Sequence, residues 1–206
     1  MTTATATLTP TANQTPAVVN ISNELSGSQW VARFPGTTST NDLSAAFRPG
    51  AVNFIDAMSQ AGATITISST LRPPERAYMM HWSWKIVQGT SPNSVPAMNG
   101  VNIEWEHPTS NASTQAAKNM VNGFGIQKLL VAPSLTSRHT QGDAIDMSIS
   151  WSGVLSILKT NGQMAVISSL PRSEMNTELH AVGAGYGVIK FLGGTADRPH
   201  WSTDGR

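Results

Sequence analysis

The stretch at residues 144–150 reads Ala-Ile-Asp-Met-Ser-Ile-Ser and alternates between apolar and polar side chains. Successive side chains of a β-strand point to opposite faces, so this pattern predicts a strand with one apolar and one polar face. Asp146 would lie on the polar face, away from the core. His139 and Gly142 stand just before the strand, where the chain must turn. The segment therefore predicts a histidine and a carboxylate at one edge of a half-buried sheet.

Other segments predict helices and strands in mixed order. Apolar residues at helical spacing predict four helices, at residues 46–60, from Pro73 onward, at 112–124 and at 178–183. Alternation predicts further strands at 64–69 and 188–192, and Asn161-Gly162 between two apolar runs predicts a hairpin with a type I′ turn. Residues 90–110 have the composition of a long loop. Since no βαβ rhythm joins these elements, the expected fold class is α+β.

The composition excludes several kinds of site. None of the 206 residues is cysteine, so disulfides and thiolate metal ligands are excluded, and any metal must be held by His, Asp or Glu. The 13 basic residues are scattered and the net charge is +1, which argues against a nucleic-acid partner. No apolar run approaches membrane-spanning length, so no integral membrane segment is expected.

The first 21 residues differ in composition from the rest. They are rich in Thr, Ala and Pro, which predicts a flexible leader at 1–21 followed by one domain at 22–206. The first charged residue is Glu24, so the leader lacks the basic start and the apolar centre of a secretory signal. We expect a monomer that is made in the cytoplasm and reaches any external site of action by another route.

Four residues form a candidate metal site. His139, Asp146 and His200 offer two imidazoles and a carboxylate, a set that suits zinc and leaves a fourth position for water, as in catalytic sites. Asp197 stands three residues before His200, where it could take a proton from that water. Each residue also has an ordinary interpretation, as a turn-capping histidine, a solvated carboxylate or a histidine packed on Trp201. Spacing alone leaves both interpretations open.

Three motifs resemble those of the zinc D-alanyl-D-alanine carboxypeptidases and L-alanyl-D-glutamate endopeptidases, a family that includes phage endolysins. SRHTQGDAID at 137–146 fits the signature Ser-x-His-x-x-Gly-x-Ala-x-Asp. DRPHWS at 197–202 is similar to the second motif, and STLRPPERAYMMHW at 69–82 resembles the first. The motifs stand in family order. Asp143 departs from the pattern, because a larger apolar residue is expected there.

The resemblance implies a hedgehog/DD-peptidase-like fold, in which a small antiparallel sheet with flanking helices surrounds one zinc ion. It implies that His139, Asp146 and His200 are the zinc ligands and that Asp197 is the general base and acid. It also implies that Arg72 steadies the scissile carbonyl or a substrate carboxylate, a task suited to a planar, permanently charged guanidinium.

Three further residues are candidates for substrate contacts. Arg76 competes with Arg72 for the same role, and Trp201 stands beside the last proposed ligand. Ser137 could bind substrate, although a turn-capping role is about equally expected. The ordinary alternative for Arg72 is an ion pair with Glu75.

The resemblance implies a zinc peptidase that hydrolyses the peptidoglycan stem peptide. We expect an L-alanyl-D-glutamate endopeptidase of phage or prophage lysis, acting on the cell wall after release or as part of a virion. The alternatives are a D-alanyl-D-alanine carboxypeptidase and a non-catalytic, zinc-containing wall-binding module. A metal-free hydrolase using Ser137 and His139 is a weaker alternative, because no oxyanion-hole motif such as G-x-S-x-G accompanies them.

Overall fold

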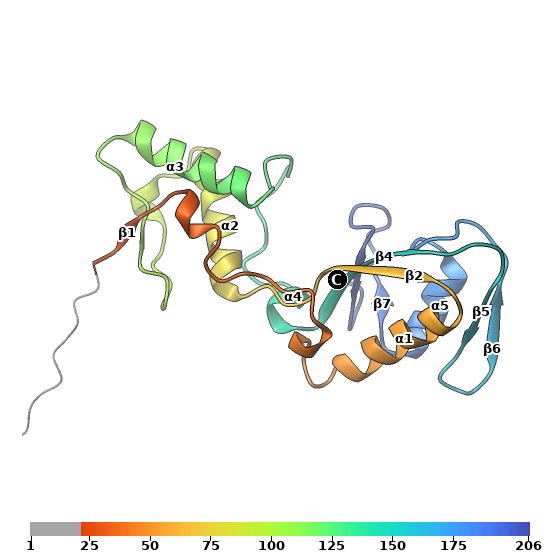
Figure 1. Cartoon of the computed structure of the whole chain (residues 1–206). Coiled ribbons are helices and arrows are strands. Elements are labelled where there is room, and N and C mark those ends of the chain that lie inside the picture. The colour runs from red at the N-terminus through yellow and green to blue at the C-terminus, as the bar shows by residue number, and fades with distance from the viewer. Residues whose placement is uncertain (1–21) are drawn as a thin grey trace, which may run out of the picture.

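Two lobes lie side by side in the computed structural model, which describes residues 22–206 (Figure 1). The sheet lobe comprises residues 37–73 and 136–206, and the helical lobe comprises 22–36 and 74–135. Small sheets with flanking helices make the described chain α+β, as predicted. The predicted leader at 1–21 lies outside the described residues.

The sheet lobe is organised around a four-stranded antiparallel sheet with strand order β2-β4-β8-β7. Its strands are β2 (Thr64–Ser69), β4 (Ala144–Ser150), β7 (Ile189–Lys190) and β8 (His200–Ser202). The bounds of β2 and β4 are those predicted, whereas β7 is shorter than predicted. The register pairs Asp146 with His200 and Ile145 with Trp201. Directly paired residues share a face, so His200 lies beside Asp146 and Trp201 lies beside Ile145 on the opposite face.

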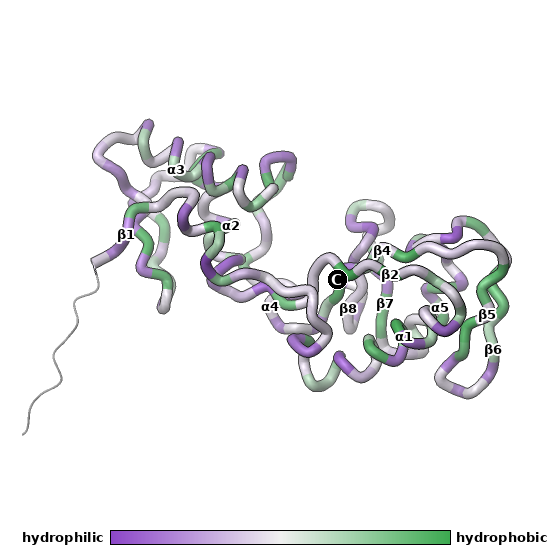
Figure 2. Tube along the Cα trace, viewed as in Figure 1, coloured by the Kyte–Doolittle hydropathy of each residue, from purple (hydrophilic) through white to green (hydrophobic). Residues whose placement is uncertain are grey.

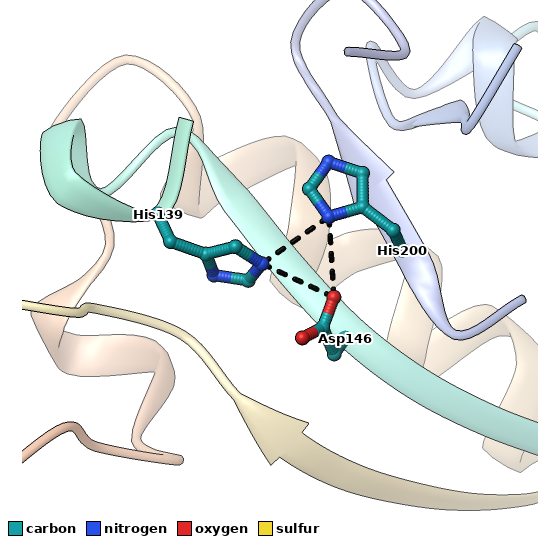
Figure 3. A group of neighbouring side chains, drawn as sticks. All are labelled: His139, Asp146 and His200. Atoms are coloured by element: carbon teal, nitrogen blue, oxygen red, sulfur yellow. Dashed lines mark hydrogen bonds and ion pairs between the residues drawn. The ribbon is translucent and has the colours of Figure 1, made fainter. Parts of the chain in front are cut away.

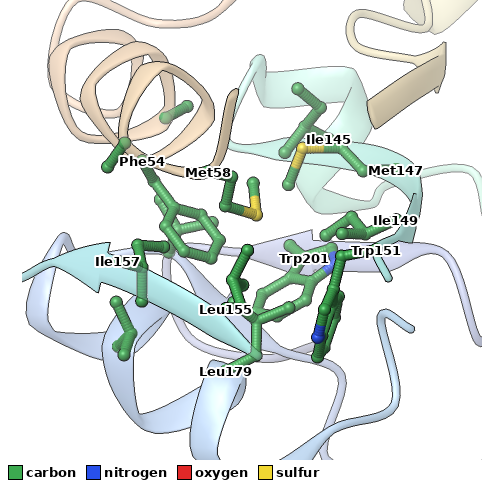
Figure 4. Packing of buried hydrophobic residues seen from close by; sticks show 14 of the residues in the cluster. Phe54, Met58, Ile145, Met147, Ile149, Trp151, Leu155, Ile157, Leu179 and Trp201 are labelled. Atoms are coloured by element: carbon green, nitrogen blue, oxygen red, sulfur yellow. The ribbon is translucent and has the colours of Figure 1, made fainter. Parts of the chain in front are cut away.

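One apolar core supports this sheet from the face that carries Ile145. Helices α1 (Arg48–Gln60) and α5 (Thr177–Gly185) and the hairpin of β5 (Leu155–Leu158) and β6 (Met164–Ile167) contribute to it. Figure 2 shows the apolar colouring along β5, β6 and β7. Figure 4 shows the packed side chains, which include Phe54, Met58, Met147, Leu155, Leu179 and Trp201. Burying each contributes about 2 kcal/mol, so the opposite, polar face is held on a rigid support.

The helical lobe has its own apolar core. Helices α2 (Pro74–Val87) and α3 (Ser110–Gly123) pack together. The lobe also contains β1 (Glu24–Leu25), β3 (Ile103–Glu104) and the short helices η1 (Ser28–Trp30) and η3 (Pro92–Ser94). The predicted loop at 90–110 therefore contains η3 and β3, which pairs with β1 in parallel. None of the helices within residues 22–206 has the length and apolar composition needed to cross a membrane.

The predicted hairpin at Asn161-Gly162 is present, but the predicted turn type is wrong. A type I′ turn needs positive φ at both central residues, and of this pair only Gly162 has one, at 80°. Gly162 N–H donates to the Lys159 carbonyl at 3.0 Å, and Asn161 Oδ1 accepts from Gln163 N–H at 3.1 Å. The hairpin lies at the far end of the sheet lobe from α4 (Arg138–Gln141) in Figure 1.

Gly183 allows α5 to approach the core closely. A Cβ at this position would lie 2.9 Å from both the Trp201 ring and the Val188 carbonyl oxygen. We expect Gly183→Ala to lower the free energy of unfolding by about 2 kcal/mol, because the core must shift to admit the methyl group. Gly185→Ala is the matched control, since its Cβ would meet only Thr160 Oγ1, at 3.6 Å. Urea unfolding measures the free energy of unfolding of both variants, and equal losses at Gly183 and Gly185 would contradict the prediction.

Candidate metal centre

His139, Asp146 and His200 point toward one another in the sheet lobe (Figure 3). His139 comes from α4, Asp146 from β4 and His200 from β8. His139 Nε2 lies 3.1 Å from Asp146 Oδ1 and 3.2 Å from His200 Nδ1, and His200 Nδ1 lies 3.2 Å from Asp146 Oδ1. Both imidazoles are buried. The structure thus brings together the three residues that the sequence selects as candidate ligands.

A tight turn places His139 against the sheet. Helix α4 ends at Gly142, whose φ is 74°, and a Cβ added to this glycine would lie 2.9 Å from Ser44 N. Both the left-handed backbone and the close approach favour glycine. Asp143, the residue that departs from the family signature, accepts a hydrogen bond from Ser44 Oγ at 2.6 Å. A polar contact therefore fixes the turn where a larger apolar residue is expected.

Two backbone carbonyls determine which ring nitrogens face the cluster. His139 Nδ1–H donates to the Thr70 carbonyl at 2.7 Å, and His200 Nε2–H donates to the Arg206 carbonyl at 2.9 Å. A neutral imidazole carries one N–H, so in the neutral form His139 Nε2 and His200 Nδ1 present lone pairs to the centre of the cluster, whereas a proton on either nitrogen would be donated to Asp146 Oδ1. Hydrogen bonds from the other ring nitrogen orient metal-binding histidines in the same way. No sequence motif marks these carbonyls, because backbone groups leave no residue-type signal.

The electrostatics of the cluster favour a cation. Burial alone would raise the pKa of Asp146, but hydrogen bonds and charge from His139 and His200 hold that pKa well below its usual range. Burial alone would lower the pKa of His200, but the Asp146 carboxylate and the Arg206 carbonyl raise it above its usual value. The carboxylate therefore stays ionised, and it attracts positive charge to the cluster.

The spacing of the three groups fits a small divalent ion. In a tetrahedral zinc site with bonds of about 2.0–2.1 Å, neighbouring ligand atoms lie roughly 3.3 Å apart. The three distances here are 3.1, 3.2 and 3.2 Å. Two imidazoles and one carboxylate are also a donor set that zinc prefers. The described residues can hold a metal ion, with His139 Nε2, His200 Nδ1 and Asp146 as ligands.

Metal binding at this cluster is expected to weaken in acid. A protonated His200 cannot bind a metal, and its raised pKa means that protons compete at pH values above the usual histidine pKa of about 6.5. Below the pKa of His200, zinc affinity should fall about tenfold for each pH unit. Competition with a chromophoric chelator between about pH 5.5 and 8 measures this slope. An affinity that is constant across this range would contradict proton competition at His200.

An open cleft of about 490 Å³ gives access to the cluster. Its volume lies in the range of ligand sites, about 300–1,000 Å³. Its walls come from the β2–α2 connection, the segment before α4, α4 itself and the β7–β8 loop. The lining side chains are those of Arg72, Ser134, Thr136, Ser137, Arg138, His139, Gln141, Asp146, Phe191, Asp197, His200 and Arg206. The hairpin residues 153–167 do not line it.

Asp197 lies at the edge of the cluster without joining it. Its Oδ2 is 3.9 Å from His200 Nδ1, and its side chain is half exposed. Burial and the nearby Asp146 carboxylate raise the pKa of Asp197, against the opposing effect of His200. Beneath this loop, buried Lys190 donates from Nζ to the His200 carbonyl at 3.0 Å and the Asp197 carbonyl at 3.3 Å. Lys190, which no sequence motif marks, therefore fixes the loop that positions Asp197.

Arg72 and Ser137 both line the cleft. Arg72 N–H donates to the His139 carbonyl at 3.0 Å, so its backbone is tied to α4. Within residues 22–206 Arg72 makes no ion pair with Glu75, the alternative that the sequence left open. Ser137 is the N-cap of α4, where its N–H donates to Thr140 Oγ1 at 3.0 Å, and its own Oγ is buried. Both ring nitrogens of His139 are already engaged by Thr70 and the cluster, so the structure gives Ser137 no general base in His139.

Two residues predicted to contact substrate, Trp201 and Arg76, do not line this cleft. Trp201 is fully buried in the core of the sheet lobe, because it is adjacent to His200 in β8 and therefore points to the opposite face. Arg76 does not line the metal cleft. Its Nη1 donates to the Val31 carbonyl at 3.0 Å, and its guanidinium lies 4.9 Å from the centre of the Phe124 ring.

The other three histidines in the described chain have separate partners. His81 Nδ1 donates to the Pro133 carbonyl at 2.8 Å, and His180 Nε2 donates to the Glu174 carbonyl at 2.8 Å. Both side chains therefore bind backbone carbonyls outside the cluster. His107 Nε2 lies 3.0 Å from Ser26 Oγ in the helical lobe and does not line the cleft.

Comparison of the chain with protein-family models, with curated proteins and with solved structures finds no match. The function of the cluster has therefore to be inferred from its geometry and from the motifs of the chain. What these establish is an α+β protein with a buried His-Asp-His group that can bind a metal ion.

Proposed function

We propose that the chain is a zinc peptidase that hydrolyses the stem peptide of peptidoglycan. One observation carries the proposal: two imidazole lone pairs and a carboxylate oxygen converge within 3.2 Å of one another beside an open cleft. The position of Asp197, 3.9 Å from one of these nitrogens, supports it. So does the resemblance to the zinc peptidases, which assigns roles to the same four residues.

The side chains of the cleft supply the parts of a hydrolytic mechanism. Zinc held by the three ligands would polarise the scissile carbonyl and lower the pKa of a bound water to about 7. Asp197 takes a proton from the attacking water and passes it to the leaving amine, and its raised pKa suits the first of these steps. Arg72 stabilises the negative charge that develops on the carbonyl oxygen.

We propose the bond between L-alanine and D-glutamate as the scissile bond, and lysis by a phage or prophage as the setting. In this proposal a monomer with the hedgehog/DD-peptidase-like fold acts on the wall after release from the cytoplasm, or as part of a virion. Endopeptidase and carboxypeptidase cleavage would use the same chemistry at such a site, so the shape of the pocket decides between them.

One defined stem peptide tests the proposal. The zinc-loaded chain is incubated with L-Ala-D-Glu-L-Lys-D-Ala-D-Ala, and the products are sequenced by tandem mass spectrometry, because loss of alanine from either end leaves a tetrapeptide of the same mass. Release of free alanine from the N-terminus, abolished by chelation and restored by zinc, is the expected result. Release of the terminal D-alanine would instead indicate the carboxypeptidase, and tight zinc binding with no product would indicate a wall-binding module.

A further inference from the structure

A second pocket, of about 270 Å³, lies beside the metal cleft, where β2 leads into α2. Arg72 lines both, so the two pockets share one guanidinium. The second pocket is lined by the end of β2, the start of α2 and the segment at 36–38. It carries hydroxyl groups from Thr38 and Ser68 and a second guanidinium from Arg76.

The second pocket has positive charge without a balancing acid. Its lining includes Arg72 and Arg76 but no Asp or Glu. Within residues 22–206 neither arginine makes an ion pair. Burial and the charge of Arg72 lower the pKa of Arg76, and no carboxylate offsets them. Two like charges that share a partly buried pocket repel each other, so an anion placed between them would relieve this repulsion.

Arg76 is held in position before any ligand arrives. Its Nη1 donates to the Val31 carbonyl at 3.0 Å, and its guanidinium stacks over the Phe124 ring. These two contacts restrict the side chain, so less rotamer entropy is lost when an anion binds. Guanidinium groups match the planar geometry of carboxylates and bind them through paired hydrogen bonds.

We infer that this pocket binds a free carboxylate of the peptide substrate, with Arg76 as its specificity-determining residue. The inference rests on the proposed function for the source of the carboxylate. A glutamate joined to its neighbour through one carboxyl group keeps the other free, next to the scissile bond. Arg72 then contacts both the reacting carbonyl and this carboxylate, which explains its place between the two pockets.

Kinetics on two matched peptides test the pocket. One is the stem peptide with the free glutamate carboxylate, and the other carries a carboxamide there. We expect the carboxamide to raise KM about tenfold for the unmodified protein. Arg76→Gln should raise KM for the acid about tenfold, keep kcat and abolish the difference between the peptides. Retention of that difference in Arg76→Gln would overturn the inference.

Arg172→Gln is the matched control, because Arg172 also donates to a backbone carbonyl, that of Gly153 at 2.7 Å, but lies outside both pockets. Its kinetics should be unchanged. Because Arg76→Gln removes packing on Phe124, Thr38→Glu provides a second test that leaves Arg76 intact. The added carboxylate should occupy the pocket, raise KM for the acid about tenfold and increase the melting temperature. Thr38→Gln should do neither, and an unchanged KM in Thr38→Glu would overturn the inference.

Calorimetric titration of the metal-free chain separates this inference from the proposed function. Binding of the acid peptide about tenfold more tightly than the amide supports the pocket, even if the zinc-loaded chain cuts neither peptide. Cleavage of both peptides with equal binding supports the peptidase and overturns the pocket. Inorganic phosphate is the second probe. If it binds more tightly than the acid peptide and displaces it, the pocket is a phosphate site and the carboxylate assignment is overturned.

Discussion

Replacement of Asp197 by asparagine is expected to reduce stem-peptide hydrolysis by about a hundred- to ten-thousandfold, the usual contribution of a general acid–base group. The carboxamide keeps the size of the side chain but cannot accept the proton of the attacking water. Zinc affinity should change by less than about tenfold, because Asp197 lies outside the three-ligand cluster, 3.9 Å from His200 Nδ1.

Single-turnover hydrolysis and chelator competition on the same preparation measure the two quantities for Asp197→Asn. Asp56→Asn is the control, since it makes the same change in net charge at an exposed position of α1 and should leave both quantities unchanged. Hydrolysis at the normal rate by Asp197→Asn would remove Asp197 from the mechanism. Loss of zinc in parallel with activity would make it a ligand instead of a base.

Substitution of His139 by alanine should weaken zinc binding on the order of a hundredfold or more. Structural zinc sites with four ligands bind with about 10–16 kcal/mol, or roughly 3 kcal/mol per ligand. Removal of His139 leaves one imidazole and one carboxylate, and it also leaves the Thr70 carbonyl without its buried donor. Hydrolysis should fall with zinc occupancy and return in part at high zinc concentration.

His81→Ala is the matched control for His139→Ala. His81 also donates from Nδ1 to a backbone carbonyl, that of Pro133, but it lies in the helical lobe outside the cluster. Its loss should leave the zinc stoichiometry of the purified chain unchanged. Normal zinc content in His139→Ala, measured by atomic emission, would contradict the assigned coordination.

The strands that carry the site were predictable because their alternation is strict. Apolar and polar residues alternate over most of residues 64–69 and 144–150, and both bounds agree with the structure. The hairpin was predictable from Asn161-Gly162, but its turn type was not. Lys159 N–H donates to the Gln163 carbonyl and Gly162 N–H donates to the Lys159 carbonyl, so the loop contains three residues, and a two-residue signal does not specify that number.

The direction of the Trp201 side chain could not be predicted, because its strand is short. His-Trp-Ser is too short for its alternation to identify a strand, so the sequence alone places Trp201 with its neighbour His200. Once β8 pairs with β4, adjacent side chains must face opposite ways, and Trp201 enters the core while His200 faces Asp146. Alternation along a strand, which places Asp146 and Ile145 on opposite faces, also excludes Trp201 from the cleft once the strand is known.

The groups that orient the site could not be read from residue types. The Thr70 and Arg206 carbonyls act through the backbone, and any residue supplies a carbonyl. Lys190 is buried beneath the Asp197 loop, although lysine is among the residues least often buried. Such contacts depend on how distant segments pack, which local sequence patterns do not encode.

The histidine ring at position 139 contacts a carbonyl 69 positions earlier and another ring 61 positions later in the chain. Helices and hairpins form from near neighbours, whereas contacts of this span come late because long loops must close first. An incompletely folded chain would bring together two of the three ligands at most, so it would bind the metal ion weakly. Under the proposed function, hydrolysis would then be confined to molecules that have folded completely.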